Sequence, residues 1–169
     1  MRFNAPALLF AALVITGCAG YRLGPTNGSR AGEKSVQVNS FVNATLEPRL
    51  SEPITFEVRR RLQQDGTYKL ATHGEGDVLV TGTITRFDRS PLSFQPKDVL
   101  TVRDYNLTIT AQIVAVERST GKTNVNKAVR GRTTVSGGSD LASAERQAIP
   151  LAAADLARNA AAAIADGTW

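Results

Sequence analysis

The residue best placed for covalent chemistry is Cys18, the only cysteine in the chain. An ionised thiol is a strong nucleophile and can take up a covalently attached group. Before it lie a charged tip at Met1-Arg2, an apolar run from Ala5 to Ile15 and the small residues Thr16-Gly17. This order is that of a secretory signal peptide, and the apolar run is too short to span a bilayer as a helix. The sequence therefore predicts a signal peptide over residues 1–17.

The ending Ile15-Thr16-Gly17-Cys18 resembles a bacterial lipobox. In that motif the thiol receives a diacylglycerol before cleavage, and the freed amine is then acylated with a chain such as palmitate. Several acyl chains on one residue satisfy the need for more than one hydrophobic anchor. The alternative is an ordinary cleaved leader followed by an unpaired cysteine. We interpret Cys18 as the lipid attachment site, and Ala19, where an aspartate would favour inner-membrane retention, favours the outer membrane.

Outside Cys18 the chain offers little catalytic chemistry. The only histidine, His73, lies in a glycine-flanked turn with Glu75 and Asp77, where solvated carboxylates are expected. No group of cysteines and histidines has the spacing of zinc ligands. The turn also precedes a strand rather than a helix, so it does not match a phosphate-binding glycine loop. We expect no enzyme activity, no metal and no cofactor.

The chain after Cys18 is predicted to form a tether and one domain. Residues 18–34 are rich in Gly, Asn, Ser and Thr and predict a lipidated flexible tether, and residues 35–169 are long enough for a single buried core. A helix is expected over 50–62, where apolar residues recur every four positions and Ser51 can cap the start. A second helix is expected after Ser139 or Asp140, with Pro150 either kinking it or marking its start.

Alternating apolar and polar residues predict strands over 35–43, 78–85, 105–117 and 125–135, and a further strand is expected at 67–72. Residues 89–103 contain Pro91 and Pro96 and predict a long loop. The fold class expected is α/β (α+β): a two-layer sandwich with a mixed, mostly antiparallel sheet of about four to five strands and two helices on one face.

The second feature that could do chemistry is a concentration of positive charge. The chain has a formal net charge of +5, and its cations gather between Arg86 and Arg132. Arg130 and Arg132 are two residues apart on a strand and so share one face, from which guanidinium groups could bind phosphates bidentately. Export leaves anionic lipid, lipopolysaccharide or an acidic protein as partners and excludes nucleic acid. An ordinary solvated surface remains the alternative.

The chain as a whole resembles the LptE family, the lipoproteins of lipopolysaccharide assembly. The resemblance begins at Gly17-Cys18-Ala19-Gly20-Tyr21-Arg22-Leu23 and continues through Val36–Asn43 and the helix over 50–62. Further similarity lies in Asp77–Ile84, the strand from Tyr105, Gly121-Lys122 and the alanine-rich C-terminal helix ending at Trp169. Each of these motifs is loose, but together they cover nearly the whole chain.

This resemblance implies a lipid-anchored protein on the periplasmic face of the outer membrane. It also implies a partner, the LptD β-barrel, for which such proteins act as plug and assembly factor, and an interaction with lipopolysaccharide. The candidate lipopolysaccharide-binding residues are Arg89, Lys97, Arg103, Arg130 and Arg132. Residues 36–45 followed by a helix also resemble the CsgG secretion-pore subunits and the LpoB activators of peptidoglycan synthases. A periplasmic domain with a hydrophobic ligand cavity is a third alternative.

Overall fold

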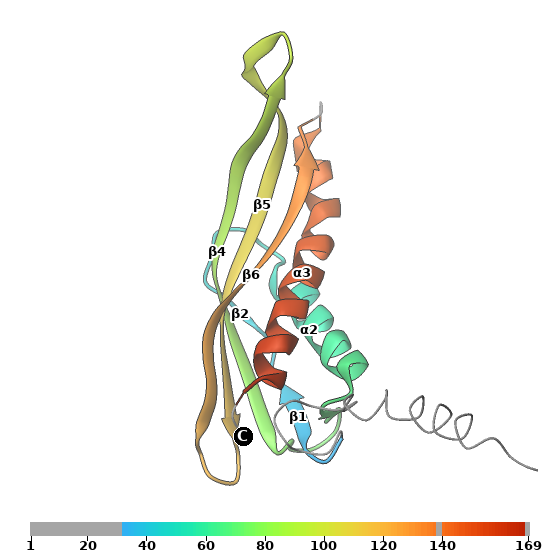
Figure 1. Cartoon of the computed structure of the whole chain (residues 1–169), viewed down its shortest axis with the longest axis vertical. Coiled ribbons are helices and arrows are strands. Elements are labelled where there is room, and N and C mark those ends of the chain that lie inside the picture. Colours follow the sequence, from blue (N-terminus) through green and yellow to red (C-terminus); the bar gives the residue numbers. More distant parts are fainter. Residues whose placement is uncertain (1–31, 138–139, 168–169) are drawn as a thin grey trace, which may run out of the picture.

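The computed structural model describes residues 32–137 and 140–167. Cys18, Ser139 and Trp169 therefore lie outside the described residues, as do the predicted signal peptide and most of the predicted tether. The elements follow one another as two short strands, a helix, a third short strand, three long strands and a long helix (Figure 1). In order they are β1 (Ser35–Val38), β2 (Val42–Asn43), α2 (Ser51–Asp65), β3 (Lys69–Leu70), β4 (Val78–Gln95), β5 (Asp98–Glu117), β6 (Thr123–Ser136) and α3 (Leu141–Ala165).

One mixed sheet forms the first layer. Its strand order is β3-β1-β4-β5-β6, with β2 pairing to β4 beside β1. The pairs formed by β1, β2 and β3 are parallel, whereas the long pairs β4–β5 and β5–β6 are antiparallel. The predicted α+β sandwich is confirmed. The sheet has six strands rather than four or five, because the first predicted strand is divided into β1 and β2.

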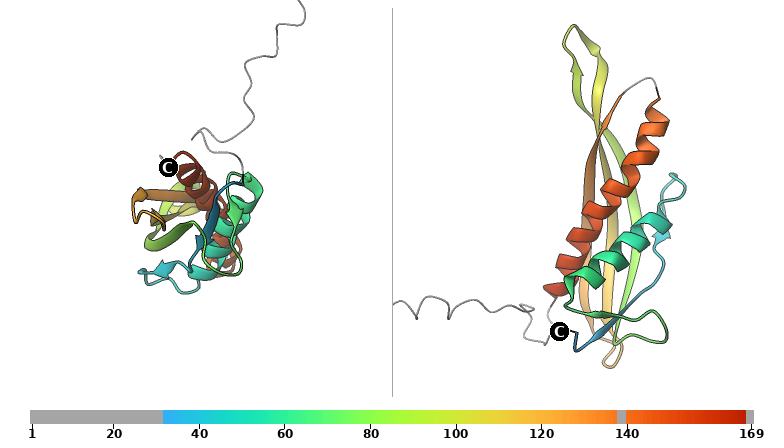
Figure 2. Two further views of the ribbon diagram at one scale, coloured as in Figure 1. Left: turned by 90° about the horizontal axis from the view of Figure 1, so that it is seen from below. Right: turned by 90° about the vertical axis from the view of Figure 1, so that its right-hand side faces the viewer.

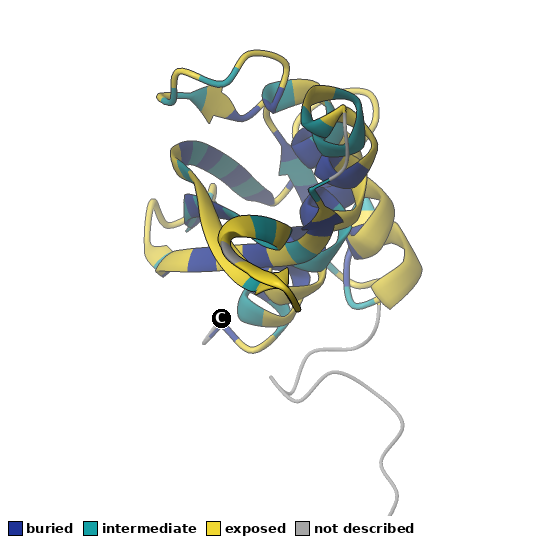
Figure 3. Ribbon diagram, turned by 90° about the horizontal axis from the view of Figure 1, so that it is seen from above, coloured by how far each residue is buried: buried dark blue, intermediate teal, exposed yellow. Residues whose placement is uncertain are grey.

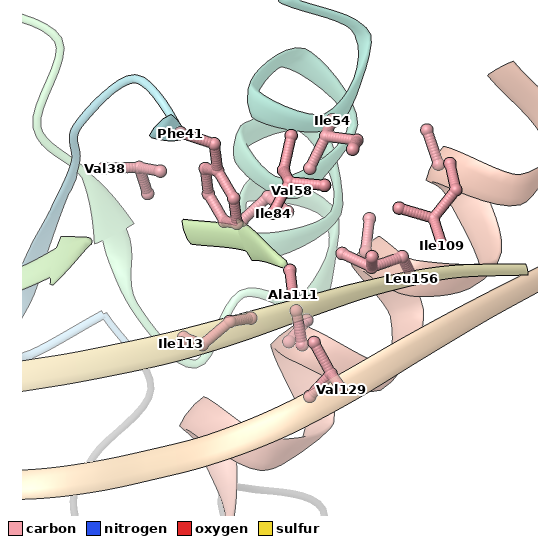
Figure 4. Packing of buried hydrophobic residues seen from close by; sticks show 14 of the residues in the cluster. Val38, Phe41, Ile54, Val58, Ile84, Ile109, Ala111, Ile113, Val129 and Leu156 are labelled. Carbon is pink, nitrogen blue, oxygen red and sulfur yellow. The ribbon is translucent and has the colours of Figure 1, made fainter. Parts of the chain in front are cut away.

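Both helices lie on one side of this sheet (Figure 2). Helix α3 packs along β6 and β5, and α2 packs against α3. The close view in Figure 4 shows Ile54 and Val58 of α2 beside Phe41 and Ile84, while Leu156 of α3 faces the middle strands. These residues belong to one buried cluster, and the view from above shows the buried segments gathered between the layers (Figure 3). Neither of these two helices covers the opposite face of the three long strands.

The ends of the helices follow from local residue types. Asp140 caps α3, because its Oδ1 accepts a hydrogen bond of 2.9 Å from the amide of Ser143. Gly66 ends α2 in the left-handed conformation that glycine adopts without strain. Ser51 was predicted as the cap of α2, but the cap residue is Leu50 and no side chain bonds there. Pro150 lies inside α3 and does not mark its start.

The predicted loop over 89–103 is wrong: this segment is a β-hairpin. Strand β4 continues to Gln95 and β5 begins at Asp98, so only two residues form the turn. Strands β1 and β2 pair with β4 no further than Ile84, which leaves the outer edge of β4 without a described partner beyond that point. A proline is tolerated on such an edge because its missing N–H would have no partner there. Pro91 therefore does not interrupt the strand.

Helix α3 approaches β6 very closely at Gly131. A Cβ atom at this position would lie 2.1 Å from the carbonyl oxygen of Ala152 and 2.4 Å from the amide nitrogen of Leu156. Two side chains of α3 also bond the outer backbone of β6. The Nδ2 of Asn159 donates to the Arg130 carbonyl at 2.7 Å, and the amide of Arg132 donates to Asp155 Oδ2 at 2.9 Å. These bonds cover the edge of β6, which would otherwise be open to pairing.

A single carboxylate joins the three long strands where the hairpin leaves the sandwich. Asp104 of β5 accepts hydrogen bonds from the hydroxyls of Ser93 in β4, at 2.6 Å, and Ser136 in β6, at 3.0 Å. Arg103 Nε donates to it at 2.9 Å. The hydrogen bond from Ser93, then the one from Arg103, hold the pKa of the Asp104 carboxyl below its usual value.

We expect the G131A substitution to destabilise the fold by about 3 kcal/mol, because the new methyl group would overlap the backbone of α3. Denaturant unfolding measures this change. The matched control is R130A at the neighbouring position, whose exposed side chain should change the free energy of unfolding by less than about 0.5 kcal/mol. Equal stability of G131A and the unmodified protein would contradict the close approach.

We expect D104N to lower the melting temperature at pH 7, and the difference from the unmodified protein to shrink as the pH falls below about 4. A carboxyl whose pKa is lowered on folding stabilises the native state above its unfolded pKa, and this contribution is lost as it becomes protonated. Thermal unfolding between pH 7 and pH 3 measures the difference. A gap that does not change with pH would show that the charge of Asp104 has no part in stability.

Candidate functional site

The candidate site lies on the face of β4, β5 and β6 that is turned away from α2 and α3, and a β-bulge in β4 creates it. Ile84 pairs with Ala111 and Arg86 pairs with the adjacent Thr110, so Thr85 is an extra residue in the strand. The Thr85 hydroxyl donates to the Thr110 carbonyl at 3.3 Å. A bulge of one residue reverses which face the following side chains occupy. As a result Phe87 packs against the core and Arg86 is exposed on the open face.

Strand pairing then places three arginines on one face, in two adjacent rows. Arg86 pairs with Thr110, which pairs with Arg130 on its other side. In the next row, Thr108 separates Asp88 from Arg132. Neighbouring strands are about 4.8 Å apart, so the backbones of Arg86 and Arg130 are about 10 Å apart across the sheet. The two rows flank a shallow groove of about 560 Å³ that is lined by Thr85, Arg86, Asp88, Ser90, Asn106, Thr108, Thr110, Arg130 and Arg132.

The groove carries excess positive charge. Arg86 makes a long ion pair of 3.8 Å with Asp88, and both side chains are largely exposed. Within residues 32–137 and 140–167, the guanidinium groups of Arg130 and Arg132 make no ion pair. The floor between the arginines consists of threonine hydroxyls and the Asn106 amide, which are hydrogen-bond donors without charge. Such a set can bind the oxygens of one or more phosphate groups bidentately.

The five predicted lipopolysaccharide-binding residues do not gather at one place. Arg130 and Arg132 share the groove, as their spacing predicted. The Arg89 guanidinium pairs with Glu145 of α3 at 2.9 Å, so it is turned toward the helix side. Arg103 pairs with Asp104 at 2.9 Å, and Lys97 lies in the turn between β4 and β5. These last three residues do not line the groove.

Sequence reasoning missed Arg86 and the neutral floor of the groove. A signal for them is present in the spacing of apolar residues along β4. Val78, Val80 and Ile84 fall at even intervals, and the next inward residue, Phe87, is three positions after Ile84. An odd step in an alternating pattern indicates an inserted residue. Recognition of this odd step in the sequence would have placed Arg86 on the same face as the threonines that line the groove.

Across 32–137 and 140–167, no group of three or more His, Cys, Asp or Glu side chains is arranged to hold a metal ion. The described helices also include none that is long and apolar enough to cross a membrane.

Comparison with known proteins gives one family and a set of similar folds. Among solved structures, a Xanthomonas campestris protein superposes with a TM-score of 0.61 at 12% identity, covering 85% of this chain and 91% of that chain. A hypothetical protein from Chlamydia trachomatis superposes with a TM-score of 0.56 at 12% identity, covering 80% of this chain and 96% of that chain. At these identities the likeness concerns the fold alone. Among curated proteins, no relative matches this sequence.

The family model described as LptE, lipopolysaccharide-assembly, matches residues 33–165, which is most of the chain and includes every described strand and helix. This match confirms the resemblance drawn from the sequence motifs, and it favours that family over the CsgG and LpoB groups. The chain belongs to the LptE family of lipopolysaccharide-assembly proteins.

Proposed function

We propose that this protein is an outer-membrane lipoprotein that assists the transport and insertion of lipopolysaccharide as plug and assembly partner of an LptD-like β-barrel. Acyl chains on Cys18 anchor it to the periplasmic face of the membrane, residues 18–34 tether the domain, and no step of its action is catalytic. Family membership and the lipobox-like residues before Cys18 support this role.

The observation that carries the proposal is the basic groove. Lipopolysaccharide is a phosphorylated glycolipid, and Arg86, Arg130 and Arg132 present guanidinium groups to one open surface. Their positions leave room for phosphates to sit above Thr108 and Thr110, where hydroxyl donors add to the charged contacts. The groove belongs to strands that are fixed by the core beneath them, so binding requires no rearrangement of the backbone.

The exposure of the groove sets the strength of these contacts. Ion pairs in contact with water contribute about 0.2–1 kcal/mol each and are weakened by salt. A carrier that must release its cargo needs contacts of this kind, because a tightly enclosed site would hold the glycolipid. We therefore expect binding that is moderate in affinity and sensitive to ionic strength.

The R130A/R132A double variant should bind purified lipopolysaccharide about tenfold more weakly, since two exposed charged contacts together are worth about 1.4 kcal/mol. Biolayer interferometry with immobilised protein measures the affinity. The matched control is K122A/K127A, which removes the same charge from exposed residues outside the groove. A similar loss in both variants would attribute binding to net charge, and unchanged affinity in R130A/R132A would remove these residues from the site.

The anchor and the partner can be tested in one purification from detergent-solubilised envelopes. The tagged protein should carry acyl chains on Cys18 by mass spectrometry and should co-purify with an LptD-like barrel in stoichiometric amount. The C18S variant should leave the membrane fraction, because a single residue bears the proposed anchor. An unmodified thiol on a freely soluble product would contradict the anchor, and an acylated protein without a barrel would contradict the partnership.

A further inference from the structure

The β4–β5 hairpin extends beyond both layers of the sandwich. Strand β6 reaches only to the level of Asp104, where Ser136 pairs with it, and α3 begins at Leu141. Past Arg103, whose carbonyl accepts a hydrogen bond of 2.6 Å from the Gly137 amide, the two arms of the hairpin have no pairing partner but each other among the described residues. Figures 1 and 2 show this end projecting past the top of α3. We refer to residues 92–100 as the hairpin tip.

The hairpin tip exposes large apolar side chains. Leu92, Phe94 and Leu100 are 57%, 48% and 89% exposed. They are three of the seven exposed large hydrophobic residues in the described part of the chain, although the tip is a short segment. Register shifts between Pro91 and Gln95 break the regular pairing here. Exposed apolar residues gathered at one place mark a binding surface more often than scattered ones do.

The surroundings of the tip indicate what covers it. Lys97 lies in its turn, and the basic groove begins on the same two strands, at Ser90 and Asn106. From Asp88 to Phe94 the strand rises about 20 Å, at about 3.3 Å per residue. Acyl chains of one leaflet span about 15 Å, half of the hydrocarbon core of a bilayer. The groove and the apolar side chains of the tip are thus separated by about the length of one lipid molecule, and Lys97 lies beyond them, in the turn.

We propose that the hairpin tip is a docking surface for the acyl chains of a lipopolysaccharide molecule whose phosphates bind in the basic groove. This inference rests on the proposed function, because it assigns a second part of the same ligand to the projecting end of two of the strands that form the groove. The tip shields part of the hydrocarbon from water while the glycolipid is outside a membrane, and the groove holds the headgroup. Leu92, Phe94 and Leu100 make the apolar contacts.

A fluorescent reporter tests the contact directly. The F94W substitution in a W169F background places the only indole at the tip, since Trp169 is the only tryptophan of the chain. Adding purified lipopolysaccharide should shift its emission to shorter wavelength. The matched control is F56W in the same background, because Phe56 is also exposed, at 62%, but lies on α2. Lack of a shift in F94W, under conditions where lipopolysaccharide binds, would overturn the proposal, as would an equal shift in F56W.

A second experiment separates this inference from the proposed function. The L92S/F94S/L100S variant should bind intact lipopolysaccharide about tenfold more weakly, since burial of several apolar side chains is lost. It should bind deacylated lipopolysaccharide as the unmodified protein does, whereas R130A/R132A should be weakened toward both ligands. Circular dichroism checks that the variant is folded, as the exposure of all three residues leads us to expect.

The outcomes are distinct. If the tip variant binds intact lipopolysaccharide with full affinity, the tip is not the acyl site and the proposed function stands. If the unmodified protein binds neither form, the proposed function fails. If F94W shifts equally with vesicles of phospholipid alone, the tip is a bilayer-binding element and the present assignment is wrong.

Discussion

The close approach of α3 to β6 at Gly131 determines how the candidate site is displayed. Because this position has no side chain, the backbone of α3 at Ala152 and Leu156 lies directly on the strand. An inward Gly131 forces its neighbours Arg130 and Arg132 to the opposite face. Asp155 and Asn159 bond the backbone of these same arginines from the helix side. The helix thus fixes the strand without using the guanidinium groups, which remain available to a ligand.

The bulge at Thr85 has a similar effect on β4, because it places Arg86 on the open face. Without it, the alternation that buries Val78, Val80 and Ile84 would turn Arg86 toward the helices. With it, Phe87 takes the inward place opposite Ile109, and Arg86 joins the row of Thr110 and Arg130. The regular alternation of β6 around Gly131 and the extra residue in β4 therefore bring three arginines to one surface.

Sequence patterns predicted the parts of the fold that are regular. Strand β5 has one buried residue at every second position from Leu107 to Ala115, so its alternation was readable, and so was the helix that follows Asp140. The hairpin was missed because Pro91 normally argues against a strand, and only the absence of an outer neighbour makes it acceptable. That absence depends on where β2 ends, which is a tertiary property.

The placement of the candidate site residues could be predicted only in part, for a related reason. Charge alone selected Arg89 and Arg103, whose acidic partners Glu145 and Asp104 could be recognised only once the strands were placed. Two-residue spacing predicted that Arg130 and Arg132 share one face, and they do, because β6 has no irregularity between them. The direction of a side chain can thus be predicted from the sequence where a strand is regular, but not where a bulge or a neighbouring element redirects the side chain.

The separation of the charged groove on β4, β5 and β6 from the apolar tip of the hairpin has a consequence for transfer of an amphiphile. Charged contacts in water are weakened by salt and re-form quickly, whereas apolar contacts are lost only when the hydrocarbon is buried against another apolar surface. A ligand held by both would release its headgroup before its acyl chains. Because the apolar end projects past α3 and β6, those chains would be presented at the outermost point of the molecule, where a receiving surface can approach without contact with the helices. The order of release is then set by the shape of the hairpin rather than by a conformational change.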